Sequence, residues 1–131
     1  MYFPMRSFLV AGISRSGIAA AEFLLKKHAK TVFLYDDVQD DNVRNAIERL
    51  TGKGCLHLKK EEVFSHISDC DVLVLSPGIP IDHPLAVAFK KAGKTIVGEA
   101  ELGARELRGP VIAVTGTNGK TTTVSLIGHI L

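Results

Sequence analysis

The chain has 131 residues, the size of one ordinary domain, and 46% of them are hydrophobic, which is enough for a buried core. Its formal net charge of +2 argues against a nucleic-acid partner, for which a strongly basic patch is expected. The apolar run near the start is far shorter than the roughly 20 residues that span a bilayer, so we expect neither membrane insertion nor a signal segment. Cys55 and Cys70 are expected to be free thiols in a reducing cytoplasm.

Strand-like and helix-like segments alternate along the chain. Continuous apolar runs predict strands at 7–13, 31–37, 55–58, 70–78, 94–98 and 111–114. Amphipathic or capped segments predict helices at 18–25, 40–54, 60–67, 84–92 and 99–107. This alternation predicts an α/β fold, a Rossmann-like, mostly parallel five-stranded sheet with helices on both faces. The Gly109-Pro110 pair precedes the sixth strand and is the expected domain boundary.

The first loop, GISRSG, has the spacing of a dinucleotide-binding fingerprint. Gly12, Ser14 and Gly17 occupy the three glycine positions of G-x-G-x-x-G, so serine replaces the middle glycine. The loop can still present amide groups and a helix N-terminus to an anion, which favours a phosphate-bearing ligand over a nicotinamide dinucleotide. Asp36 and Asp37 end the second strand, where an acid often meets a ribose hydroxyl. Alternatively, the loop only caps a helix and both acids are solvated.

The loop after the fourth strand, SPGIPIDHP, lies where open α/β sheets bind ligands. Ser76 offers a hydroxyl and an amide, and Pro77-Gly78 predicts a tight turn that brings backbone close to a phosphate. A plain strand-to-helix connection is the alternative. His83, beside the helix start, is interpreted as structural, as are the other histidines.

The last loop, VTGTNGKTT, is a variant phosphate loop. Val114 stands where the strict G-x-x-x-x-G-K-[ST] pattern requires its first glycine, but the strand, the loop, the G-K-T and the helix remain. Amides near 116–121 can surround an anion, Lys120 can reach the β- and γ-phosphates, and Thr121 can place a hydroxyl on Mg²⁺. A chance G-K-T in an ordinary loop is the alternative.

These motifs together resemble a known family. VTGTNGKTT is similar to the phosphate loop of Mur ligases and folylpolyglutamate synthases, and three further motifs resemble the N-terminal domain of Mur ligases: GISRSGIAAAEFL, LSPGIP…HP and VGEAELG. The resemblance is strongest to the branch that joins D-glutamate to UDP-N-acetylmuramoyl-L-alanine. It implies a cytoplasmic step of bacterial peptidoglycan synthesis that uses ATP and Mg²⁺, passes through an acyl phosphate and forms an amide.

The resemblance also implies site residues and domain limits. Binding of the UDP portion is expected from Ser14, Arg15, Asp36, Asp37, Ser76 and Gly78. Binding of ATP phosphates is expected from Gly116, Thr117, Asn118, Gly119, Lys120, Thr121 and Thr122, with Lys120 catalytic and Thr121 on Mg²⁺. Residues 1–108 would form the UDP-substrate domain and 109–131 the truncated start of a central ATP-binding domain.

The parts needed for D-glutamate and for the complete metal site would lie beyond residue 131. We therefore expect the chain to be inactive alone, with 110–131 disordered or packed on a neighbouring chain. Three alternatives stay open: another Mur ligase, a ligase like folylpolyglutamate synthase, and a nucleotide-binding Rossmann module without catalysis.

Overall fold

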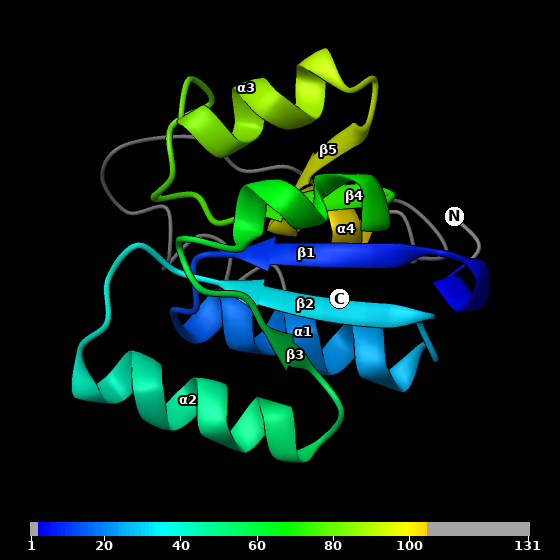
Figure 1. The fold of residues 1–131 in the computed structure, drawn as a ribbon. Helices are drawn as coiled ribbons and strands as arrows, with labels where there is room; N and C mark the ends of the chain where they lie inside the picture. The colour runs from blue at the N-terminus through cyan, green and yellow to red at the C-terminus, as the bar shows by residue number, and fades with distance from the viewer. Residues whose placement is uncertain (1–2, 105–131) are drawn as a thin grey trace, which may run out of the picture.

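The structure, a computed structural model, describes residues 3–104 of the chain. Five strands form one sheet in the order β3-β2-β1-β4-β5, as Figure 1 shows. The strands are β1 (Ser7–Ala11), β2 (Thr31–Tyr35), β3 (Leu56–His57), β4 (Val72–Leu75) and β5 (Thr95–Gly98). The α-helices are α1 (Arg15–Lys26), α2 (Asp41–Gly52), α3 (Pro84–Lys91) and α4 (Glu99–Ala104), and the 3₁₀ helices are η1 (Phe3–Met5) and η2 (Val63–Asp69).

Helices cover both faces of the sheet, because successive residues of a strand point to opposite sides. Figure 1 shows α1 and α2 on one side and α3 on the other. Val10 belongs to a buried cluster with Leu24 of α1 and Leu50 of α2. Its neighbour Leu9 belongs to a second cluster with Phe89 of α3. The strands are therefore buried on both faces, which explains why they read as continuous apolar runs in the sequence.

The predicted α/β fold is confirmed, and every strand pair of the described sheet is parallel. The strand predicted at 7–13 is shorter, because the chain turns at Gly12, whose φ is +93°. The helix predicted at 60–67 is the 3₁₀ helix η2, the tighter form that short connections often adopt. The helix predicted at 40–54 is α2, and the side chain of its N-cap, Asp40, accepts a hydrogen bond from the Val43 amide at 2.9 Å.

Several predictions fall on residues that the structure does not describe. They are the strand at 111–114, the boundary at Gly109-Pro110, the phosphate loop and the disorder of 110–131. Within the described part of the chain, no helix has the length and apolar character needed to cross a membrane.

Candidate functional site

The direction in which strands are added to the sheet reverses between β1 and β4. The chain passes from β1 to β2 and β3 on one side, and β4 and β5 lie on the other. Open parallel sheets bind ligands outside the carboxyl ends of the strands at such a reversal. The loops after β1 and β4 are therefore the first place to look for a site.

These two loops are in direct contact. A Cβ atom added to Gly12 would lie 2.5 Å from the Ser76 Cβ, so only glycine fits against the β4 loop. The Ser76 amide donates to the Ala11 carbonyl at 3.0 Å, which extends the pairing of β1 and β4 by one step. The two loops thus form one continuous wall at the carboxyl edge of the sheet.

The first turn of α1 faces outward beside this wall. Ser14 is the N-cap, but its side chain makes no capping hydrogen bond, and its hydroxyl lies 3.4 Å from the Ser16 hydroxyl. Both serines and Arg15 are exposed. Exposed amides at a helix start, next to a cationic side chain, are suited to an anionic group such as a phosphate.

The loop after β4 forms the tight turn that the sequence predicted. The Ile79 amide donates to the Ser76 carbonyl at 3.0 Å, which closes the turn around Pro77 and Gly78. Ser76 is 8% exposed, whereas Gly78 is exposed and a Cβ on it would meet nothing within 4 Å. The turn therefore leaves room for a ligand above Gly78.

Asp36 connects the end of β2 to the loop after β1. One carboxylate oxygen accepts from the Ile13 amide at 2.7 Å, and the other accepts from the Val38 amide at 2.8 Å. Each oxygen keeps one further lone pair for a ligand donor. Asp36 therefore fixes the shape of the first loop, whatever else it contacts.

Asp37 connects the same strand end to the start of α3. Its Oδ1 accepts from the Tyr35 hydroxyl at 2.5 Å, and its Oδ2 lies 2.7 Å from Nε2 of His83. The hydrogen bond from Tyr35 and the one from His83 lower the pKa of the Asp37 carboxyl, although partial burial opposes them. Burial, followed by the Asp37 carboxylate, raises the pKa of the Tyr35 hydroxyl.

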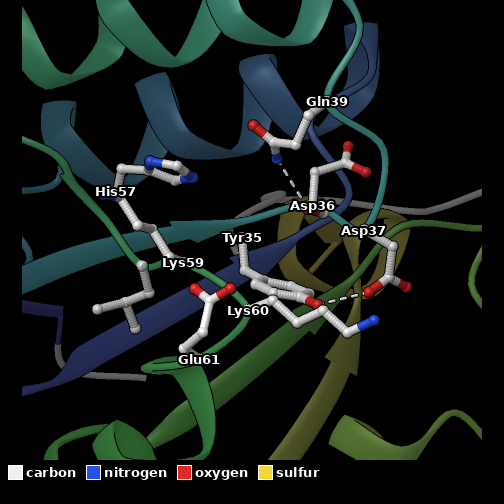
Figure 2. A pocket seen from close by; sticks show the side chains of 9 residues that line it. Tyr35, Asp36, Asp37, Gln39, His57, Lys59, Lys60 and Glu61 are labelled. Carbon is white, nitrogen blue, oxygen red and sulfur yellow. Dashed lines mark hydrogen bonds between the residues drawn. The ribbon is translucent and has the colours of Figure 1, made fainter.

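A pocket of about 320 Å³ opens between the ends of β2 and β3 (Figure 2). It is lined by Tyr35, Asp36, Asp37, Gln39, His57, Leu58, Lys59, Lys60 and Glu61. Nε2 of His57 is buried and has no hydrogen-bond partner among the described residues. The pocket therefore has side chains of both charges in its lining, which suits a small polar group.

Glu99 adds a carboxyl to the edge at the end of β5. Both of its oxygens are buried without a hydrogen-bond partner in the described part of the chain, and burial raises the pKa of this carboxyl. The nearby Ser16 hydroxyl partly offsets the rise, although it does not reach hydrogen-bonding geometry. Glu99 lines a largely apolar cavity of about 470 Å³ with Ser16 and Pro77, at the reversal between β1 and β4.

The six residues expected to bind the UDP portion all lie at one edge of the sheet, but they do not share one pocket. Asp36 and Asp37 line the pocket of Figure 2, whereas Ser14 and Arg15 line a separate hollow of about 560 Å³ beside α1 and α2. The residues expected to bind ATP and Mg²⁺ lie outside the described residues. Their roles, and those of the six, stay predictions.

Sequence reasoning missed Glu99 and Lys60 as residues of this edge. Glu99 directly follows a strand, a position that could have been noticed. Lys60 follows a strand of only two residues, too short to give a clear signal. Residues 3–104 contain no group of three metal-ligating side chains.

The reversal of strand order and the glycine-containing loop after β1 define a class of protein, the Rossmann-like α/β domains. A solved structure shares this fold: a pseudomurein peptide ligase type C from Methanothermus fervidus, with a TM-score of 0.60 and 21% identity, covering 96% of this chain and 26% of that one.

The family is narrower than the fold. Residues 6–98 match the model of the Mur ligase MurD-like, N-terminal domain, and the chain belongs to this family, as its motifs predicted. It is 42% identical over 123 residues to the UDP-N-acetylmuramoylalanine–D-glutamate ligase of Koribacter versatilis (strain Ellin345), covering 94% of this chain and 27% of the relative. It is 38% identical over 126 residues to the ligase of the same name from Lachnospira eligens, covering 96% of this chain and 28% of that relative. The chain thus spans about a quarter of the length of these curated relatives.

Proposed function

We propose that this chain is the UDP-N-acetylmuramoyl-L-alanine-binding portion of an ATP-dependent ligase that adds D-glutamate during cytoplasmic peptidoglycan synthesis. One observation carries the proposal. In a member of the Mur ligase family, the loops after β1 and β4 meet at the reversal of strand order, and the exposed first turn of α1 lies beside them. Phosphates bind readily at such a place, because the helix start offers amide donors and a favourable dipole.

In this proposal the diphosphate lies across the two loops. Amides at the start of α1 and the turn at Ser76 and Gly78 would donate to its oxygens, and the guanidinium of Arg15 would balance its charge. The uridine would extend toward the end of β2, where Asp36 and Asp37 lie.

We also propose that 109–131 begin a central ATP-binding domain, with 1–108 as the substrate domain. Residues 116–122 would hold the ATP phosphates, with Lys120 on the β- and γ-phosphates and Thr121 on Mg²⁺. Bound ATP would supply the phosphoryl group that converts the substrate carboxylate to an acyl phosphate, with ADP as the leaving group; the amine of D-glutamate would then displace phosphate and lose a proton to form the amide. Within this chain, Lys120 would orient and neutralise the transferring group.

A binding titration of the 131-residue chain tests the substrate assignment. UDP-N-acetylmuramoyl-L-alanine and UDP should both raise the melting temperature, and NAD should not. A ligand at 100 times its Kd should add about 2.7 kcal/mol to the free energy of unfolding. Stabilisation by NAD alone would contradict the proposal and favour a dinucleotide-binding module.

Two arginine variants locate the diphosphate. Arg15→Ala should weaken UDP binding by about tenfold or more, since a hydrogen bond to a charged group is worth about 1.5–3 kcal/mol. Arg44→Ala is the matched control, because Arg44 is an exposed arginine of α2 that pairs only loosely with Asp41, at 3.7 Å. Equal effects of the two variants would place the diphosphate elsewhere.

Turnover is a separate test. The 131 residues alone should release no D-glutamate-dependent phosphate from ATP, because phosphoryl transfer depends on a complete metal and phosphate site. Measurable D-glutamate-dependent release by the purified chain would contradict this expectation.

A further inference from the structure

We propose that Asp37 is a positioning residue that holds the loop after β4 at a fixed distance from the end of β2, through His83. The sequence suggested a direct ligand contact for Asp37, and the geometry points to an indirect role. The inference rests on the proposed function, because the loop that Asp37 positions is the one assigned to the diphosphate.

The first step is the position of the contact in the sheet. Asp37 follows β2 and His83 ends the loop that follows β4, so the pair is 46 residues apart in sequence. In the sheet, β1 lies between β2 and β4. The hydrogen bond of 2.7 Å therefore spans the carboxyl end of β1, next to the glycine loop.

The second step is the protonation state of His83. Its Nδ1 accepts a hydrogen bond from the Leu85 amide at 3.1 Å, which caps the first turn of α3. An acceptor nitrogen carries no proton, so in the neutral ring the proton lies on Nε2 and is donated to Asp37. The cap and the bridge to Asp37 thus require the same tautomer and support each other.

The third step is the orientation of Asp37 itself. The Tyr35 hydroxyl donates to its other oxygen, and Figure 2 shows the phenol of Tyr35 reaching the carboxylate from the strand below. Lys60 also reaches toward this carboxylate in Figure 2, and its charge further lowers the pKa of Asp37. Since Tyr35 is buried, it fixes the carboxylate relative to the sheet. A fixed carboxylate can in turn fix His83.

The neighbouring Asp36 completes the arrangement. It accepts from the Ile13 amide at 2.7 Å, so adjacent aspartates hold the loop after β1 and the start of α3. The loops that would bind the diphosphate are therefore both attached to the end of β2. Losing either attachment should change their spacing without unfolding the sheet.

Two substitutions separate the bridge from other roles. Asp37→Asn keeps the size of the side chain but turns either an amide NH₂ donor or a neutral, weaker acceptor toward Nε2 of His83. The ring then cannot keep both its hydrogen bond to residue 37 and its hydrogen bond from the Leu85 amide at full strength. His83→Asn keeps a good N-cap for α3 and is too short to reach Asp37. Asp82→Asn is the matched control, since it removes one negative charge from the same loop and Asp82 is exposed.

The experiment measures affinity for UDP-N-acetylmuramoyl-L-alanine by calorimetry, at a temperature where every variant of the 131-residue chain is folded. Asp37→Asn and His83→Asn should each weaken binding about tenfold. The double variant should also lose about tenfold and no more, because both substitutions remove the same hydrogen bond between Asp37 and His83. Asp82→Asn should bind like the original chain. Unchanged affinity of His83→Asn, or a hundredfold loss in the double variant, would overturn the positioning role and leave Asp37 as a direct contact.

A ligand-free measurement keeps this test separate from the proposed function. Nitrogen and carbon chemical shifts of the His83 ring should report the Nε2-protonated tautomer, and Asp37→Asn should shift the amide signals of 76–83. A ring protonated on Nδ1, or unchanged amide signals, would refute the bridge even if the ligand binds. If the original chain fails to bind the ligand while the ring signals agree, only the proposed function fails.

Discussion

Gly17 gives the sharpest test of how the first loop packs against α1. A Cβ at this position would lie 1.9 Å from the Gly12 carbonyl oxygen, where ordinary contact begins near 3.4 Å. Gly17→Ala must therefore move the helix start or the loop by roughly 1.5 Å, and the opposing atom is backbone, which cannot rotate away. Overpacking of this kind costs about 1–3 kcal/mol or more. We expect Gly17→Ala to lower the free energy of unfolding by about 3 kcal/mol.

Gly52→Ala is the control for the change of residue type itself. A Cβ at Gly52, the last residue of α2, would meet nothing within 4 Å. The substitution should stabilise the chain by about 0.4–1 kcal/mol, because alanine loses less backbone entropy on folding. Urea denaturation at 25 °C measures both variants, and a slope of about 1–3 kcal/mol per molar converts the loss at Gly17 into a midpoint lower by about 1–3 M. If the urea midpoint of Gly17→Ala lay within about 0.2 M of that of the original chain, the close approach of the loop and the helix would be refuted.

Three further predictions concern single side chains. Burial raises the pKa of the Glu99 carboxyl above 4.5, so the contribution of Glu99 to stability is complete below that pH and is lost as the pH rises through its folded-state pKa. Glu99→Gln should therefore raise the melting temperature at pH 7 and change it little at pH 4. A lower melting temperature of this variant at pH 7 would count against a buried carboxyl without a hydrogen-bond partner. Cys55 and Cys70 are buried, and burial raises the pKa values of their thiols to about 11 and about 12. A thiol reagent at pH 8 should therefore label them only after urea is added, and fast labelling of the folded chain would contradict this. Asp40→Ala removes the cap on Val43 and should cost about 1 kcal/mol by urea denaturation, and no change would mean that the cap contributes nothing.

Hydrophobic pattern and glycine spacing were enough to predict the five strands of the described sheet, its α-helices and its two covered faces. The structure adds that the passage from β1 to α1 is tight at two glycines of this spacing, Gly12 and Gly17, because no side chain fits at either place. The clash at Gly17 is with Gly12 and is local in the sequence, whereas the clash at Gly12 is with Ser76 of the loop after β4.

The partners of the loop residues could not be predicted in the same way. Asp37 contacts His83 across the end of β1 because β4 crosses to the far side of that strand. Alternating strands and helices are equally compatible with β4 adding beside β3, in which case β3 and not β1 would lie between the ends of β2 and β4. Likewise, the sequence places Glu99 after a strand, but its burial depends on how α4 packs against α1.

The crossing of β4 has a further consequence for the spacing of the site. Neighbouring strands are about 4.8 Å apart, so β2 and β4 are separated by about 10 Å with β1 between them. An aspartate from one side and an imidazole from the other, joined by a hydrogen bond of 2.7 Å, have the combined length to cross this gap, whereas two short side chains do not. The pair therefore sets the width at which the loops after β2 and β4 flank the glycine loop. A ligand that touches all three loops depends on that width, so its affinity should respond to the length of residue 83 more than to its charge.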